Sequence, residues 1–190
     1  MRHEEVQPLI EDFRSSFEAD MRRARVRAMV MGPSRRSRRD DATEAARALR
    51  KAIVKHCNDH DVAVEPELRH LVAVSEEALG GAHNLCIYEL RLAKRCDLIV
   101  IVAASAGPLV ELGMFAERRF LRTRSVLVLL DHRYKQFDSF INHGPRKAYQ
   151  RIKAHIVDVD YERPEHVQDV LAIVGSLIED ERANKLANRF

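Results

Sequence analysis

Two short apolar runs in the middle of the chain limit the folds that are open to it. Leu98–Ala103 contains only Leu, Ile, Val and Ala, and Val126–Leu130 is a second run of the same kind. A strand that is apolar at every position is buried on both faces, which is typical of a parallel sheet covered by helices on both sides. The chain is therefore expected to fold as an α/β protein.

The rest of the chain alternates between strand and helix patterns. Besides the two runs, the predicted strands are 26–31, 62–65 and 155–159, and the predicted helices are 41–57, 84–95, 108–119, 148–153 and 164–184. The segment 66–81 is ambiguous. Strands that alternate with helices favour parallel pairing through right-handed crossovers. We expect a flavodoxin-like three-layer sandwich whose five-stranded parallel sheet has the order 2-1-3-4-5.

The first 24 residues are predicted to form an extra helix outside this sheet. Its apolar residues recur at steps of three and four, as in Val6, Leu9, Ile10, Phe13 and Phe17. A length of 190 residues suits one domain, so residues 25–190 are expected to form a single α/β domain. A soluble monomer rarely leaves such an apolar stripe in water. We therefore expect a homo-oligomer, at least a dimer.

The composition excludes several classes of protein. Hydrophobic residues make up 46% and charged residues 32% of the chain, which excludes a disordered or low-complexity protein. The longest apolar stretch, Leu98–Ala104, is much shorter than the roughly 20 residues that cross a bilayer, and Met-Arg-His-Glu-Glu does not begin a secretory signal. The cysteines Cys57, Cys86 and Cys96 have no CxxC spacing. We expect a cytoplasmic protein with no membrane contact, disulfide or zinc site.

Two loops mark the place where a ligand is expected. In a fold of this kind, ligands bind outside the carboxyl ends of the strands, where the strand order reverses. One loop there begins with Gly32, Pro33 and Ser34, and the other contains Ser105 and Gly107. Gly107 permits close approach of a ligand, and the free N–H groups at a helix start favour an anion or a sugar oxygen. These five residues are the candidate ligand contacts.

Glu111 is the candidate reactive group beside the second loop. Proline favours the first position of a helix, so Pro108 predicts that Glu111 lies in the first helical turn, where the helix dipole keeps a carboxylate ionised. Its neighbours Val110 and Leu112 are poor companions for a solvated charge. Glu111 is therefore either a functional carboxylate or a residue that only stabilises the start of the helix.

Two motifs in the chain resemble a known superfamily. Glu89 stands eight residues before Asp97, and the apolar strand that follows leads into the pattern Gly107-x-x-x-Glu111-Leu-Gly. This arrangement resembles the nucleoside 2-deoxyribosyltransferase-like superfamily. The segments Ser105–Phe115 and Ser139–Pro145 are more closely similar to a related group of bacterial retron effector proteins. The resemblance extends over residues 26–150.

The resemblance implies an enzyme that cleaves or exchanges an N-glycosidic bond of a nucleoside, a nucleotide or NAD, with no metal or cofactor, and a role as an effector of phage defence. Glu111 occupies the position of the glutamate that attacks the anomeric carbon. Glu89 occupies that of the acid that recognises the base, although a solvated helix face explains it equally well. Asn142, in the second motif, is a candidate ligand contact or a cap of the Gly144-Pro145 turn.

The sequence departs from the resembling proteins at two places. Ala106 stands where the transferases have an aspartate, and Ala104 stands where the retron effectors commonly have a glutamate. These losses favour a second hypothesis, in which the chain is a catalytically silent nucleotide-binding sensor or interaction module.

A third hypothesis rests on charge. The net charge is only +3, but four arginines gather in one loop, Arg35, Arg36, Arg38 and Arg39. This loop is either solvated or contacts phosphate, which leaves a regulatory protein or a nucleic acid open as a partner.

Overall fold

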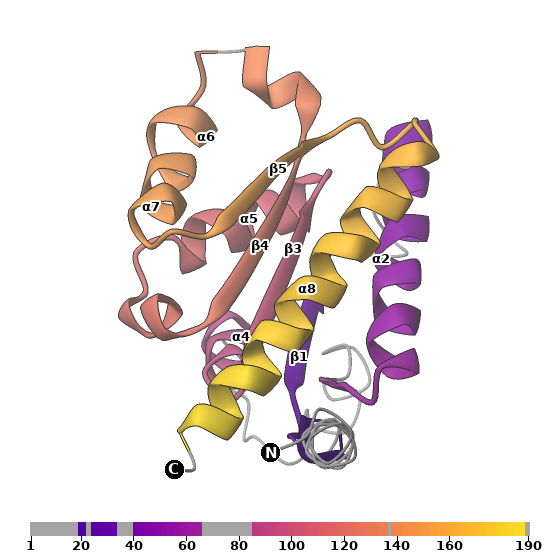
Figure 1. Cartoon of the computed structure of the whole chain (residues 1–190). Coiled ribbons are helices and arrows are strands. Elements are labelled where there is room, and N and C mark those ends of the chain that lie inside the picture. Colours follow the sequence, from indigo (N-terminus) through magenta and orange to yellow (C-terminus); the bar gives the residue numbers. More distant parts are fainter. Residues whose placement is uncertain (1–18, 22–23, 34–39, 66–84, 137, 189–190) are drawn as a thin grey trace, which may run out of the picture.

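The computed structural model describes residues 19–21, 24–33, 40–65, 85–136 and 138–188. Its centre is a five-stranded sheet in the order β2-β1-β3-β4-β5, in which every pair of neighbours is parallel (Figure 1). The strands are β1 (Arg27–Met31), β2 (Ala63–Val64), β3 (Leu98–Ala103), β4 (Ser125–Asp131) and β5 (His155–Val159). The predicted α/β class, the flavodoxin-like architecture and the strand order are confirmed.

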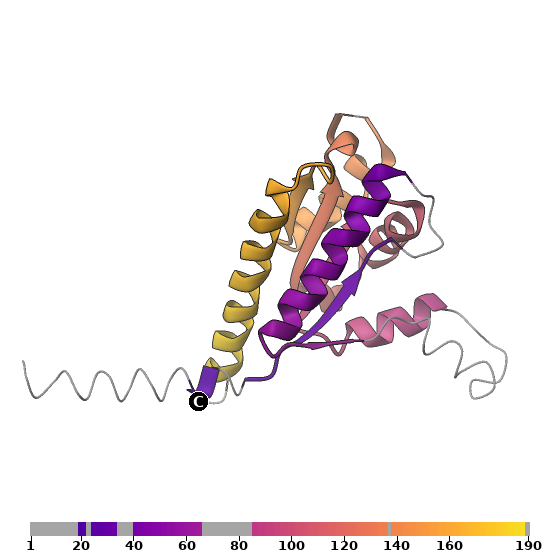
Figure 2. The same ribbon diagram turned by 90° about the vertical axis from the view of Figure 1, so that its right-hand side faces the viewer.

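Helices cover both faces of this sheet (Figures 1 and 2). One layer consists of α2 (Asp41–Asp59) and α8 (Glu165–Ala187). The other layer contains α4 (Leu85–Ala93), α5 (Ala106–Phe115), α6 (Phe140–His143) and α7 (Pro145–Arg151). Two 3-10 helices, η1 (Arg119–Thr123) and η2 (His132–Gln136), lie on either side of β4 in the sequence.

The central strand β3 shows why its sequence is apolar at every position. Val100 packs in one core cluster with Ile53 of α2 and Ile178 of α8. Ile101, one residue further, packs in the second cluster with Phe115 of α5. Successive side chains of a strand point to opposite faces, so each β3 side chain enters one of two cores. All six residues of the strand are fully buried.

The predicted start of one helix agrees with the structure, and the predicted starts of two others differ from it. Helix α2 begins at Asp41 as predicted, and Asp40 caps it, because its carboxylate accepts a hydrogen bond of 2.8 Å from the Thr43 N–H. Helix α7 begins at Pro145 rather than at 148, since a proline is pre-organised for the first helical position. Helix α5 begins at Ala106, two residues before Pro108, and ends at Phe115 instead of continuing to Arg119.

Several predictions fall wholly or largely outside the described residues. They are the extra helix at 1–24, the ambiguous segment 66–81 and the arginine loop at 35–39. Within 1–24 the structure describes residues 19–21, which are helical, and Ala24, which lies in a bend. Among the helices that the structure describes, none is both long and apolar enough to cross a membrane.

Candidate active site at the carboxyl ends of β1 and β3

The strand order reverses between β1 and β3, and the helices that follow these two strands lie on opposite faces of the sheet. Helix α2 follows β1 and packs in one core, whereas α5 follows β3 and packs in the other. The β1 and β3 ends are neighbours, since Met31 pairs with Ile101. This divergence of the two connections creates the crevice in which such folds bind ligands.

Gly32, the first residue after β1, is required by a side chain that passes directly beneath it. A Cβ atom at position 32 would lie 2.7 Å from Cδ of Arg50 and 3.2 Å from Cβ of Val102. Arg50 comes from α2, and its Nε donates a hydrogen bond of 3.1 Å to the Val30 carbonyl. The end of β1 therefore holds the Arg50 guanidinium beside the candidate site.

Ser105 is the residue before α5, but its hydroxyl does not cap the helix. A capping oxygen accepts from the N–H of the second or third helical residue, and the third residue here is Pro108, which has no N–H. Oγ of Ser105 is buried and has no hydrogen-bond partner among the described residues. The proline thus leaves a polar atom at the site available for a ligand.

Glu111 presents the second unsatisfied atom of the site. Its Oε2 is buried, and no described residue forms a hydrogen bond with it. The pKa of this carboxyl is raised from 4.5 to about 7, with burial as the largest cause. The negative charge of Glu89 raises the pKa as well, and the positive charge of Arg50 acts in the opposite direction.

The sequence-based picture of Glu111 needs correction on two points. Because α5 begins at Ala106, Glu111 is its sixth residue and lies beyond the first turn. The dipole effect fades within that turn, so desolvation outweighs it. At neutral pH the carboxyl is therefore partly protonated rather than held ionised as expected.

Glu89 lies on α4 and is close enough to Glu111 for the two charges to interact. The Glu89 side chain is half-buried, and burial raises its pKa. These properties argue against a fully solvated helix face. The structure thus brings together the two carboxylates that the sequence singled out and adds the cation of Arg50.

The other candidate contacts differ in what surrounds them. Gly107 is exposed, and a Cβ at this position would have no atom within 4 Å, so the space in front of it is open. Pro33 is buried at the end of β1, and Ser34 lies outside the described residues. The Asn142 side-chain amide donates to the Tyr134 carbonyl at 2.8 Å, which ties α6 to η2.

Sequence reasoning missed two charged residues near this edge of the sheet. Arg50 has a signal, because it follows Ala46 by four residues and precedes Ile53 by three on the buried stripe of α2. Asp131 ends β4 and is buried; its carboxylate accepts hydrogen bonds of 3.0 and 2.9 Å from the main-chain N–H and Nε of Arg133. The sequence signal for Asp131 is an acid that directly follows an apolar strand.

Metal ligands are not grouped in this region or in any other part of the chain that the structure describes. No set of three or more His, Cys, Asp or Glu side chains among those residues is placed to hold a metal ion.

Comparison with known proteins places the chain in a family. The "Retron Ec86 putative ribosyltransferase/DNA-binding protein" of Escherichia coli is 34% identical over 77 residues, which are 40% of this chain and 25% of that relative. The match thus spans only about a quarter of the relative's length. No solved structure matches the chain. The family model of the STM3845 retron effector protein matches residues 46–189, from α2 through α8 and including both site carboxylates, so the chain belongs to this family of retron effectors.

Proposed function

We propose that this retron effector breaks the N-glycosidic bond of a nucleoside, a nucleotide or NAD, and passes the sugar to water or to a second acceptor. The observation that carries the proposal is the buried Oε2 of Glu111, which has no hydrogen-bond partner among the described residues, next to the charges of Glu89 and Arg50 at the ligand edge of the sheet. The printed name of the Escherichia coli relative, which includes ribosyltransferase, supports the same class of chemistry.

In the first step, ionised Glu111 attacks the anomeric carbon of the sugar. The bond from this carbon to the base nitrogen breaks, its electron pair goes to the base, and the base takes a proton from solvent. A buried carboxylate suits this step because the developing oxocarbenium ion carries positive charge, which a poorly solvated negative charge stabilises strongly.

In the second step, water attacks the same carbon and releases Glu111. The electron pair of the sugar–Glu111 bond returns to the carboxylate, and Glu89 takes the proton of the attacking water. The raised pKa of Glu89 brings it closer to neutral pH, which favours a general base. In the ground state, Glu89 also serves as an acceptor for an N–H of the base.

Ser105 and the open space at Gly107 hold the sugar or its phosphate. The Ser105 hydroxyl is not used as a helix cap, and Gly107 leaves room for a ligand atom close to the main chain. The N–H groups of the first turn of α5 have no partner within the helix and favour an anionic oxygen.

A catalytically silent nucleotide-binding module is the second candidate, and the loop before α5 favours it. Ala104 is buried and Ala106 begins α5, so neither position supplies a further carboxylate. In this case a nucleotide raises the melting temperature of the protein but is recovered intact.

The test is the release of free base. The purified chain is incubated with NAD, with nucleosides and with nucleoside monophosphates, and the products are separated by reverse-phase chromatography. We expect release by the native chain, a fall of at least about 100-fold in Glu111→Gln, and no change in Glu117→Gln. Glu117 is an exposed acid just after α5 and serves as the matched control.

Two outcomes contradict the proposal. Intact substrate in every incubation, together with a nucleotide-induced rise in melting temperature, supports the silent module instead. Equal release by the native chain and Glu111→Gln places the chemistry at another residue.

We also propose that residues 25–190 act as one domain and that the chain works as a homo-oligomer. The support is the apolar stripe of residues 6–17, which needs a cover in water. Multi-angle light scattering at micromolar concentration is expected to give at least twice the mass of the 21.8 kDa chain. A monomer mass contradicts this expectation.

A further inference from the structure

Basic side chains gather at the edge of the sheet that lies opposite the candidate active site. In a parallel sheet all strands begin at the same edge. Here the adjacent strands β1, β3, β4 and β5 each begin at or shortly after one or more basic residues. We call these basic residues the amino-edge cations: Arg27, Lys94, Arg95, Arg122, Arg124 and Lys153. Arg124 is half-buried and the other five are exposed.

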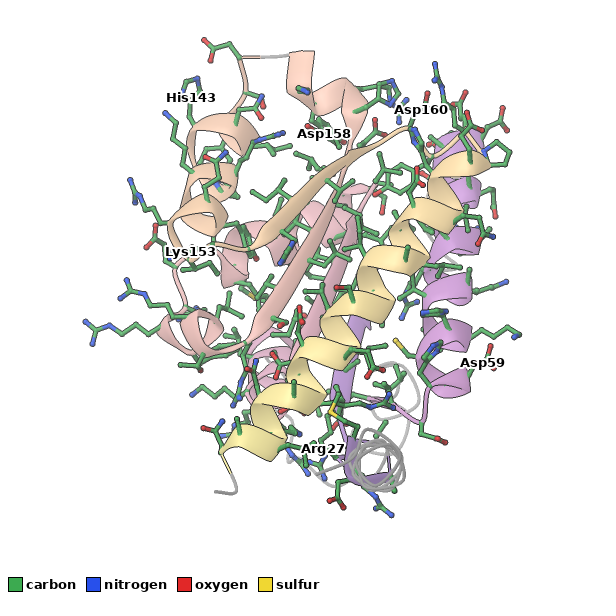
Figure 3. The ribbon with its side chains drawn as sticks, viewed as in Figure 1. Arg27, Asp59, His143, Lys153, Asp158 and Asp160 are labelled. Carbon is green, nitrogen blue, oxygen red and sulfur yellow. The ribbon has the colours of Figure 1, made fainter. Side chains whose placement is uncertain are left out.

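Hydrogen bonds and strand register hold these cations side by side. Leu98 of β3 pairs with Ala28 of β1 and with Ser125 of β4, which aligns the starts of the three strands. The Arg124 guanidinium also donates to the Lys94 carbonyl at 3.1 Å. Figure 3 shows Arg27 beside the start of β1 and Lys153 beside the start of β5, away from the end that carries Asp158 and Asp160.

The cations at the two edges of the sheet differ in whether they form ion pairs with acids. At the carboxyl edge, cations pair with carboxylates: Arg133 with Asp131, Arg146 with Asp158, and Arg163 with Asp160. Among the described residues, none of the amino-edge cations forms an ion pair with an acid. Within the part of the chain that the structure describes, the two edges therefore differ in whether their cations are paired with acids.

Three acids near the amino edge contact groups other than the side chains of these cations. The Asp97 carboxylate accepts from the Arg27 main-chain N–H at 2.8 Å and from the Lys185 ammonium at 2.6 Å. Glu181 accepts from the Ser125 hydroxyl at 2.7 Å, and Glu117 lies 4.0 Å from an arginine of α7. Glu181 keeps its charge, because the Ser125 hydroxyl is neutral, and Glu65 adds another negative charge near Cys96. The six cations outnumber these acids, so the edge keeps a positive field that favours an external anion.

We propose that the amino-edge cations bind the phosphate backbone of a nucleic acid. Neighbouring strands lie about 4.8 Å apart, so the row from β1 to β5 is about 14 Å long. One strand of duplex DNA carries a phosphate for about every 3.4 Å of helix axis, so the row faces about four phosphates. This proposal does not depend on the glycosidase activity, because it concerns the opposite edge of the sheet.

Charge alone characterises this surface, which favours a nucleic acid over a protein partner. Protein interfaces are anchored by apolar and aromatic side chains at their centre. Among the described residues, the exposed large hydrophobic side chains are Val110 of α5 and Phe140 of α6, and neither belongs to the amino edge. Four of the six amino-edge cations are arginines. Guanidinium groups suit phosphate oxygens.

The test measures the affinity of the full chain for a fluorescein-labelled 20-base-pair DNA by anisotropy between 50 and 200 mM salt. Four neutralised phosphates give a slope of log K against log salt of about −3.6, which is a loss of about 150-fold over this range. Removing two cations in Arg95→Gln/Arg122→Gln is expected to bring the slope to about −1.8. Both residues are exposed, so folding is expected to be unchanged.

The matched control removes two positive charges from the helix layer formed by α2 and α8, away from the amino-edge cations. Lys51→Gln/Lys55→Gln changes two exposed lysines of α2 and is expected to keep the slope of the native chain. Glu111→Gln is also expected to bind DNA as the native chain does, which separates this test from that of the glycosidase proposal. An equal loss of slope in both double variants overturns the proposal. Displacement of the DNA by polyglutamate at the same charge concentration also overturns it, because the surface then binds any polyanion.

Discussion

The Arg50 side chain passes beneath Gly32 so closely that even a methyl group at position 32 would lie 2.7 Å from Arg50 Cδ. Arg50 cannot simply move aside, because its Nε is bound to the Val30 carbonyl. The glycine and the arginine therefore form one unit, which places a positive charge near Glu111. The position of the Arg50 side chain depends on the absence of a side chain at Gly32.

Gly32→Ala is expected to lower the free energy of unfolding by about 1–3 kcal/mol, since it overpacks this contact. In an Arg50→Ala background the same change is expected to cost much less, because only the 3.2 Å contact with Val102 remains. Urea unfolding of the four proteins of this double-mutant cycle gives the coupling energy. Equal costs in the two backgrounds would show that the two residues are independent.

Glu111→Gln is expected to stabilise the protein above pH 7 and to have little effect near pH 4.5. The folded pKa of Glu111, about 7, is above its ordinary value of 4.5. Its contribution to stability is therefore fully present below pH 4.5 and is lost as the pH rises through 7, by up to about 3 kcal/mol. Glutamine carries no proton to lose and avoids this cost.

The measurement is the melting temperature of the native chain, Glu111→Gln and the control Glu117→Gln at pH 5 and pH 8. The Glu111→Gln melting temperature is expected to exceed that of the native chain at pH 8 alone. A decrease at pH 8 would instead identify Glu111 as a structural anchor that needs its charge.

Most of the fold could be predicted from the sequence because its signals are local. The runs 98–103 and 126–130 predicted buried strands, and the structure extends the second by one residue at each end. Helix starts are harder to place near a proline, because a proline fits more than one early position. Pro145 begins α7, whereas Pro108 is the third residue of α5. A proline fits each of these early positions, since the first N–H groups of a helix have no partner within it.

The sequence singles out candidate site residues but does not contain the electrostatics that act on them. Spacing alone singled out Glu89 and Glu111, and the structure places their charges within reach of each other. Desolvation and the influence of Arg50 depend on tertiary packing across three helices, which no local pattern contains. For this reason the sequence predicts an ionised Glu111, whereas burial in the folded chain raises the pKa of this carboxyl to about 7.

Ser105→Ala is expected to weaken ligand binding with little effect on stability. The Ser105 hydroxyl makes no capping bond, so its loss is expected to cost less than about 0.5 kcal/mol of unfolding free energy. Asp40→Ala is the matched control, because Asp40 does cap α2 and its loss is expected to cost about 0.5–2 kcal/mol. Urea unfolding measures both costs. If Ser105→Ala lowers the free energy of unfolding as much as Asp40→Ala does, the Ser105 hydroxyl does form a stabilising hydrogen bond and this prediction is wrong.

The pH dependence of base release is expected to report the two charges that act on Glu111. Because the ionised carboxylate attacks the sugar, kcat/KM is expected to rise with pH through about 7, the pKa of Glu111. Glu89→Gln removes a negative charge that raises this pKa, so the rise is expected to move to lower pH. Arg50→Gln removes a positive charge that lowers the pKa, and the rise is expected to move to higher pH. Arg50→Lys keeps the charge and is expected to leave the midpoint close to that of the native chain. Shifts in the same direction for Glu89→Gln and Arg50→Gln would show that the carboxyl responsible for the profile is not Glu111.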